Sequence, residues 1–289
     1  MRIAVTNKMN KWFIDSFFNV ETLYFSTPSE ILGGLKKHKP DVFVFGDFKN
    51  CFNDFEIDEL KYIISQNNIN TLFYGGWQGF GLGNYKSAFF DDDMSLNFRD
   101  DELQMVIYKI SATQENDIFT FSFDDCPEIA FYNKVDISTD DYRVILKWND
   151  DKSSYPLLLS KVSNNRKQLL LLTTITPPGG AKRLVLWNKY PTIWKEMLEW
   201  LGSDRLSYNK TENNILVSLL SNYWSEQLTC DFANKVLANE INSFEEELLL
   251  LMRDMYDRLG DWKMSTIIGE KYYQYNKKTH GDTIHERSA

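Results

Sequence analysis

The sequence predicts an α/β protein in which helices cover a parallel sheet and an all-helical segment follows. Three apolar strands, "RIAVT" (2–6), "DVFVFGDF" (41–48) and "INTLFYGG" (69–76), alternate with amphipathic helices on short connections. Alternation of this kind is typical of a parallel sheet with helices packed on its faces. After residue 203 the strand patterns stop, and every later amphipathic segment predicts a helix.

Two helices connect these three strands. Residues 27–40 begin with Thr27 as a cap and Pro28 at the first helical position, and Pro40 ends the helix. Residues 55–68 carry apolar side chains at the three-to-four spacing of one helix face. Those side chains are Ile57, Leu60, Ile63 and Ile64.

The pattern changes between residues 84 and 155, where pairs of acidic residues separate short alternating segments such as "YRVILKW". We expect strands and turns inserted near the edge of the sheet. "QLLLLTTI" (168–175) then predicts another buried strand. Residues 190–202 predict an amphipathic helix with Gly202 at its C-cap. Its apolar face consists of Ile193, Met197, Leu198 and Leu201.

We therefore expect two domains, an α/β domain over 1–202 and a helical C-terminal extension over 203–289. The clearest helix of the extension has a capping box at Ser243 and Glu246 and a stop signal at Gly260. Its wide apolar face predicts contact with a second copy or a partner protein, or simply with the α/β domain. The candidate interface residues are Phe244, Leu248, Leu251, Met255 and Leu259.

Composition excludes several classes of function. The formal net charge is −9 and the pI about 5.0, which argues against binding to nucleic acid or to an anionic membrane. No apolar run approaches the roughly 20 residues that span a bilayer, so we expect a cytoplasmic protein. The three cysteines are widely spaced, and the acidic pairs lack calcium-loop spacing. We expect no disulfide framework, metal site or cofactor.

The densest glycine cluster, "GGWQGFGLG" (75–83), directly follows the third strand. It lacks the Gly-Lys-Ser/Thr ending of a P-loop and the third glycine of a dinucleotide fingerprint. The remaining interpretation is a strand-to-turn elbow of the form G-x-Nuc-x-G, which presents one side chain above the sheet. Gly75 and Gly79 fit this spacing and place Trp77 at the tip.

Five motifs in order over residues 1–202 resemble the class I glutamine amidotransferase-like fold, and within it a branch near the trehalose-utilisation (ThuA-like) proteins. The first is the "GGW-x-x-F" elbow, and the fourth is the late "LLLLTTITPPGG" segment. The second, third and fifth motifs are matched by Pro127, Tyr132, Asn133 and Val135, by Pro156, Leu157 and Leu158, and by Trp187, Tyr190, Pro191, Trp194, Trp200 and Leu201.

The resemblance implies a flavodoxin-like open parallel sheet with any site at the carboxyl ends of its strands. Active members of the wider fold have a cysteine at the elbow tip and a histidine after the late strand. This sequence has Trp77 at the tip, and the loop "ITPPGGAK" contains no histidine. Cys51 and Cys126 have no neighbouring histidine to lower their pKa, so we interpret them as inert thiols. Hydrolysis of glutamine by a Cys–His pair is therefore not expected.

Polar and aromatic residues follow the predicted strands and would meet at one rim of the sheet. Their amides and hydroxyls, beside flat aromatic rings, suit a sugar or a heterocycle; alternatively, they satisfy loop backbone groups. The candidate ligand-binding residues are Thr6, Asn7, Asp47, Gly75, Gly76, Trp77, Gln78, Phe80, Thr174 and Thr176.

Two hypotheses on function follow. The first is a catalytically degenerate amidotransferase-like protein with a binding, assembly or regulatory role, which acts as a homo-oligomer or with a partner protein. The second is a hydrolase or transferase that acts on a small sugar or amide at the rim, with acids such as Asp47 in place of the lost catalytic residues. Membership of a multi-component system is a third possibility that the sequence leaves open.

Overall fold

The chain forms two compact units, Met1–Asn214 and Ile215–Ala289. The structure is a computed structural model that describes residues 1–46, 52–75, 79–80, 96–107, 109–126, 129–138, 140–149, 153–173, 175, 187, 189–207, 253 and 262–280. The division into units reflects compactness alone, and the domain boundary expected after residue 202 stays a prediction.

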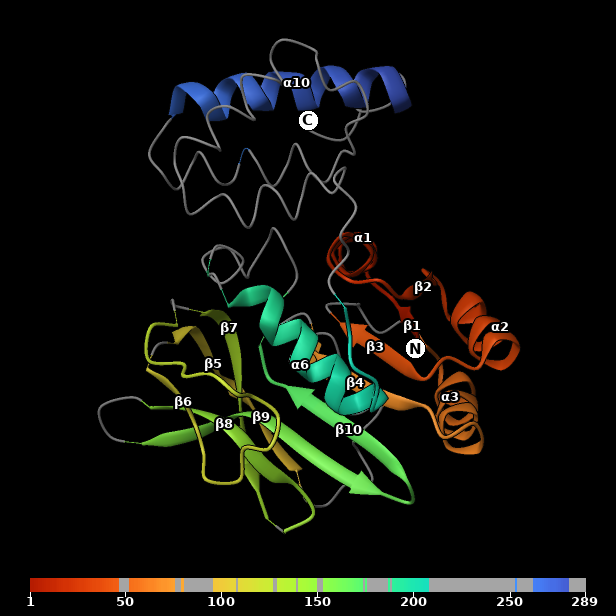
Figure 1. Ribbon diagram of the computed structural model, residues 1–289, viewed down its shortest axis with the longest axis vertical. Helices are drawn as coiled ribbons and strands as arrows, with labels where there is room; N and C mark the ends of the chain where they lie inside the picture. Colours follow the sequence, from red (N-terminus) through yellow and green to blue (C-terminus); the bar gives the residue numbers. More distant parts are fainter. Residues whose placement is uncertain are drawn as a thin grey trace. The chain divides into compact units, whose positions relative to one another are not determined.

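The first unit is built on an eight-stranded sheet with the order β2-β1-β3-β4-β10-β9-β8-β6 (Figure 1). The strands from β2 to β10 run parallel to their neighbours. Their order is that of the flavodoxin-like doubly wound fold, so the expected α/β class is confirmed. These strands are β1 (Arg2–Val5), β2 (Glu21–Tyr24), β3 (Val42–Gly46), β4 (Asn70–Tyr74) and β10 (Arg166–Leu171).

The expected parallel sheet accounts for one half of the strands, and the other half is paired differently. From β10 onward the sheet is antiparallel, through β9 (Ser154–Ser163), β8 (Arg143–Asn149) and β6 (Ile110–Ala112). A two-residue turn joins β9 to β10, with Asn164 at φ 49° and Asn165 at φ 62°. Such turns hold two strands in antiparallel pairing, so the inserted strands extend the same sheet.

A separate antiparallel ribbon pairs β5 (Leu96–Ile107) with β7 (Ile129–Ile137). Its pairing shifts register between Phe98 and Leu103. The acidic stretch 100–102 lies within β5 at this irregularity. The sequence therefore predicted strands in this region correctly but could not assign their partners.

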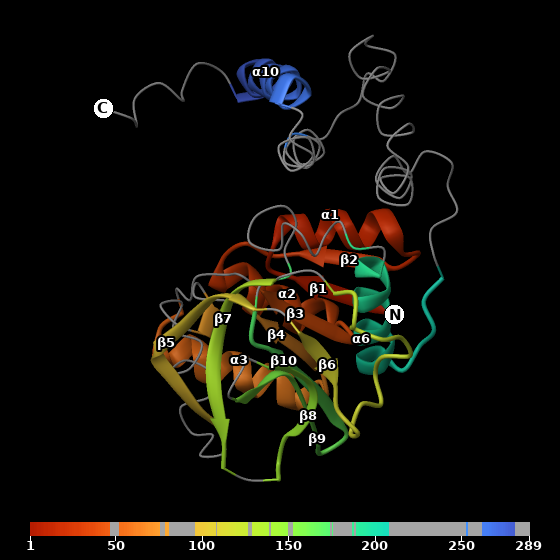
Figure 2. The ribbon, with the colours of Figure 1, turned by 90° about the vertical axis from the view of Figure 1, so that its left-hand side faces the viewer.

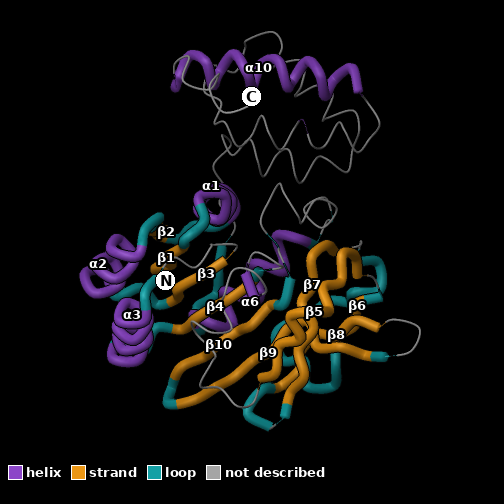
Figure 3. The backbone as a smooth tube through the Cα atoms, turned by 180° about the vertical axis from the view of Figure 1, so that it is seen from behind, coloured by secondary structure: helices purple, strands orange, loops and turns teal. Residues whose placement is uncertain are grey.

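Helices lie on both faces of the sheet (Figures 2 and 3). α2 (Pro28–His38) packs beside α3 (Asp54–Gln66), whereas α6 (Tyr190–Gly202) crosses β3, β4 and β10 on the opposite face. α1 (Lys8–Phe17) and the edge strand β2 were not assigned from the sequence. Both are short, and β2 has no fully buried residue, so its apolar pattern is weak.

The helix ends show which local signals were correct. Thr27 caps α2 by accepting a hydrogen bond from the Glu30 amide, and Pro28 opens the helix, as predicted. The C-cap of α6, however, is Ser203 at φ 60°, and not Gly202. A Cβ atom at Gly202 would lie 2.1 Å from Met1 Sδ, so this glycine allows close packing of the chain start.

The second unit is described through α10 (Trp262–His280) and Arg253. Ile268 of α10 is fully buried, and the Arg253 guanidinium lies 5.9 Å from the ring centre of Tyr272. A helix was expected here, and α10 confirms one that ends at His280. The predicted helix with the Ser243 capping box and the candidate interface residues lie outside the described residues. Within the described part of the chain, no helix is long and apolar enough to cross a membrane.

Candidate functional site

The carboxyl ends of β1, β3 and β4 meet at one edge of the sheet, as the sequence predicted for parallel strands. The register pairs Val5 with Val44 and Gly46 with Tyr74. Thr6, which follows β1, is buried and joins two of these ends. Its N–H donates to the Val44 carbonyl at 3.2 Å, and its hydroxyl accepts from the Gly46 N–H at 3.3 Å. Thr6 therefore satisfies backbone groups at the rim.

A buried polar pair lies beside Thr6 and was not predicted. Asn10, in the first turn of α1, and Tyr74, the last residue of β4, are both fully buried. Asn10 Nδ2 donates a hydrogen bond to the Tyr74 hydroxyl. Within the described residues, the carboxamide oxygen of Asn10 has no hydrogen-bond partner. A buried acceptor left without a donor lowers the stability of the folded state by about 1–3 kcal/mol. A donor that reached this oxygen would therefore stabilise the fold.

A second buried amide lies near the end of β10. Asn133 of β7 donates its backbone N–H to the Leu172 carbonyl at 3.0 Å, and its side-chain nitrogen has no partner among the residues that the structure describes. Thr173, which follows Leu172 in the sequence, is fully buried. Asn133 belongs to the "YN" motif that carries the family resemblance, so the sequence contained a signal for it. No comparable motif marks Asn10 in the sequence, because asparagine is common in short helices and does not by itself indicate a site.

The elbow is described only at its two ends. The Gly75 N–H donates to the Leu171 carbonyl at 3.2 Å, which ties the start of the turn to β10. Phe80 is 1% exposed, and its ring stacks on Phe98 with centres 5.3 Å apart. A protein side chain therefore already occupies one face of the ring that we expected to offer to a ligand.

Several predicted site residues lie outside the described part of the chain, and their roles stay predictions. They are Asp47, Gly76, Trp77, Gln78, Thr174 and Thr176 at the rim, together with the five candidate interface residues. Asn7, half-buried directly after Thr6, is described and lies at the predicted edge.

The described histidine and cysteine of the first unit lie apart and do not form a catalytic pair. His38 ends α2, and its carbonyl accepts a hydrogen bond from Arg2 at the start of β1, so it lies at the sheet edge opposite the rim. Burial, together with the neighbouring Asp125 carboxylate, raises the pKa of the Cys126 thiol to about 12. Lys189 only partly offsets these effects. Cys126 is therefore a thiol at neutral pH.

Cys126 is expected to react with iodoacetamide at least about 100-fold more slowly than free cysteine near pH 8, because only the thiolate is nucleophilic. The rate should rise about tenfold per pH unit up to pH 10, since the thiolate fraction rises in that proportion below the pKa. Mass spectrometry of the alkylated peptide measures the rate, with the unfolded chain in denaturant as control. Alkylation at the free-cysteine rate near pH 8 would contradict the raised pKa.

Among the described residues, no group of three or more His, Cys, Asp or Glu side chains is arranged to hold a metal ion. The buried rim side chains Thr6, Asn10 and Tyr74 are hydrogen-bonding groups without a carboxylate, imidazole or thiol. Their arrangement is suited to recognition of hydroxyl or amide groups.

Comparison with known proteins shows a likeness of fold. No protein-family model matches the chain, and no curated protein matches it in sequence. Cytoplasmic protein STM1381 from Salmonella typhimurium LT2 has a similar structure, with a TM-score of 0.52 and 15% identity over 70% of this chain and 99% of that one. Cytoplasmic protein STM3548 from Salmonella typhimurium has a TM-score of 0.49 and 14% identity over 69% and 98% of the two chains. A ThuA-like protein from Bacteroides uniformis ATCC 8492 has a TM-score of 0.42 and 10% identity over 71% and 93%.

The class that the fold defines is therefore a doubly wound α/β protein of flavodoxin-like order with an antiparallel extension. A ThuA-like protein is among its structural neighbours. At these identities the likeness concerns the fold, and fold alone does not specify an activity.

Proposed function

We propose that the first unit binds a small neutral polar molecule, a sugar or an amide, at the strand-end rim, and does not hydrolyse glutamine through a Cys–His pair. The observation that carries the proposal is the buried carboxamide oxygen of Asn10, which no donor from the described part of the chain reaches. Buried polar atoms in native proteins are nearly always paired. A ligand hydroxyl or N–H that enters from the rim would supply the missing donor.

The chemistry of the described rim favours binding over catalysis. Acid–base catalysis needs a group whose pKa lies near the working pH. Asn10 donates to the Tyr74 hydroxyl, and Thr6 is the buried side chain that joins β1 to β3 at the rim. Neither Tyr74 nor Thr6 is a carboxylic acid, an imidazole or a thiol. Hydroxyl and carboxamide groups instead fix the orientation of a neutral ligand.

Topology also supports a ligand at this edge. In open α/β sheets, ligands bind outside the carboxyl ends of the strands, where the strand order reverses. In this sheet the order reverses between β1 and β3, and Thr6 bridges those two strands. Asn10 follows Thr6 in α1, so the unpaired oxygen lies next to the switch point.

The proposal predicts ligand-dependent stabilisation that requires Asn10. The full chain is screened by thermal unfolding against glucose, trehalose, N-acetylglucosamine and glutamine, with ammonia release measured in the glutamine arm. A ligand at ten times its Kd stabilises the folded state by about 1.4 kcal/mol, a Tm rise of about 3–6 °C for a unit of this size. Asn10→Leu should abolish the rise, because leucine keeps the volume and removes both polar atoms.

Asn19→Leu is the matched control, since Asn19 is exposed just after α1, and it should leave the ligand response unchanged. Stabilisation by none of the four compounds would contradict the proposal, as would ammonia release from glutamine. Turnover of a sugar or amide that is lost in Asp47→Ala would establish the enzyme hypothesis instead.

A further inference from the structure

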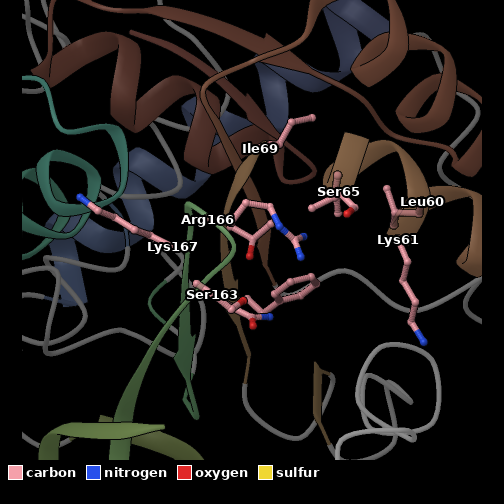
Figure 4. A pocket seen from close by; sticks show the side chains of 11 residues that line it. Leu60, Lys61, Ser65, Ile69, Ser163, Arg166 and Lys167 are labelled. Atoms are coloured by element: carbon pink, nitrogen blue, oxygen red, sulfur yellow. The ribbon is translucent and has the colours of Figure 1, made fainter. Parts of the chain in front are cut away.

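A cavity of about 380 Å³ lies at the sheet edge opposite the rim, between α3 and the starts of β4 and β10 (Figure 4). β4 runs from this cavity at Thr71 to the rim at Tyr74, so the two places are distinct. The cavity is lined by Leu60, Lys61, Ile64, Ser65, Ile69, Thr71, Phe73, Ser163, Arg166, Lys167 and Gln168.

Strand register explains why the polar lining residues share one face of the sheet. Thr71 of β4 lies opposite Gln168 of β10, and Ser163 of β9 lies opposite Arg166. Side chains two residues apart on a strand point to the same face, so Arg166 and Gln168 project together. The tight turn between β9 and β10 fixes Ser163 beside Arg166.

The charges of the lining select for an anion. Arg166 is half-buried, and its guanidinium forms no hydrogen bond and no ion pair within the described part of the chain. Figure 4 shows its guanidinium among the lining side chains, whereas the ammonium groups of Lys61 and Lys167 point outward. Lys167 Nζ instead donates to the Trp200 carbonyl at 2.6 Å and to Ser203 Oγ at 2.9 Å. The described lining contains no acidic residue, although the chain has more acidic than basic residues.

Apolar side chains form the remaining wall. Leu60 and Ile64 of α3 are buried, as are Ile69 and Phe73. The same lining includes the hydroxyl residues Ser65, Thr71 and Ser163 and the amide of Gln168. A ligand that fits both parts has a charged head and an apolar body.

We propose that this cavity binds a small organic oxyanion, a carboxylate or a phosphate ester with an apolar body. The guanidinium fork matches two oxygens of either head group, and the nearby hydroxyls supply further donors. The cavity volume lies in the range of small-molecule sites. The site is separate from the rim and does not depend on the function proposed there.

The test measures binding of four probes to the full chain by titration calorimetry. Phenylacetate and phenyl phosphate carry the oxyanion, whereas phenethylammonium and benzyl alcohol carry the same ring with a positive or neutral head. At least one oxyanion should bind tenfold or more tightly than both other probes. The tighter of the two oxyanions then identifies the preferred head group.

Arg166→Gln should weaken oxyanion binding about tenfold or more, because it removes the positive charge and the fork. Arg166→Lys keeps the charge without the fork and should give an intermediate loss. Thr71→Val, which keeps the side-chain shape, should weaken binding by a smaller factor. Arg205→Gln is the matched control, since Arg205 is exposed after α6, and it should leave the affinity unchanged.

The proposal is wrong if no oxyanion probe binds, if phenethylammonium binds as tightly, or if Arg166→Gln retains the affinity. Asn10→Leu separates this test from that of the rim, because it should leave phenylacetate binding unchanged. If Asn10→Leu loses phenylacetate binding while Arg166→Gln binds phenylacetate as tightly as the unchanged chain, the anion binds at the rim. That result would overturn the assignment of the oxyanion site to the cavity.

Discussion

Replacement of Trp194 by alanine is expected to lower the free energy of unfolding of the first unit by about 3–5 kcal/mol, the usual cost of removing a large buried aromatic side chain. Trp194 is fully buried in α6 and packs between α1 and the sheet. Its ring centre lies 5.9 Å from that of Phe13 and 5.9 Å from that of Tyr74, with the Tyr74 ring at right angles. The truncation therefore leaves a cavity where three elements meet. Denaturant unfolding of the full chain measures the change.

Two further variants separate packing from polarity at this position. Trp194 Nε1 is buried and finds no acceptor in the described part of the chain, so Trp194→Phe removes this donor along with part of the ring. It should cost clearly less than Trp194→Ala. Trp262→Ala is the exposed control, since Trp262 is 69% exposed on α10, and it should change stability by less than about 0.5 kcal/mol. Equal losses for Trp194→Ala and Trp194→Phe would show that packing at Trp194 is not the cause.

Gly46→Ala is expected to destabilise the first unit by about 3 kcal/mol, at or above the usual cost of overpacking. A Cβ atom at Gly46 would lie 1.8 Å from Cε1 of Tyr74, well inside contact distance. The Tyr74 ring must then move, and this movement disrupts both its hydrogen bond with Asn10 and its packing on Trp194. Thermal or denaturant unfolding of the full chain measures the effect.

A double-mutant cycle tests that cause directly. In a Tyr74→Ala background, Gly46→Ala should cost less than about 1 kcal/mol, because the ring that it would strike is absent. Gly33→Ala is a control that should change the free energy of unfolding in the opposite direction. Nothing lies within 4 Å of a Cβ at Gly33, in the middle of α2, so alanine there should stabilise by about 0.5–1 kcal/mol. An unchanged cost of Gly46→Ala in the Tyr74→Ala background would rule out the clash.

Local sequence patterns were sufficient to predict the main helices and strands of the α/β unit. The spacing of Ile57, Leu60, Ile63 and Ile64 predicted α3, and all four are buried. Thr27 and Pro28 predicted the start of α2. The signals are strong there because one face of each element is buried, and burial imposes periodicity on the sequence. β2 was not predicted because none of its residues is fully buried. α1 was not predicted although it buries Phe13, Ile14 and Phe17.

The candidate site was predictable only in its location. Apolar strands that end together imply a rim, and the structure places Thr6, Asn7 and Gly75 there. The Asn10–Tyr74 hydrogen bond joins residues 64 positions apart, and no local pattern encodes such a pairing. Likewise, the Phe80 ring was expected to face a ligand, but its contact with Phe98 of β5 depends on how a distant ribbon folds back.

The sequence by itself determined the α/β class, the order of strand and helix along most of the first unit, and the edge at which the parallel strands end together. These depend on hydrophobic periodicity and helix caps, which act between residues a few positions apart. Only the tertiary structure decided that the sheet is parallel in one half and antiparallel in the other. It also decided that Asn10 keeps an unpaired oxygen and that Arg166 lines a cavity. Those properties depend on which distant segments pair, because partners are selected by packing across the whole sheet.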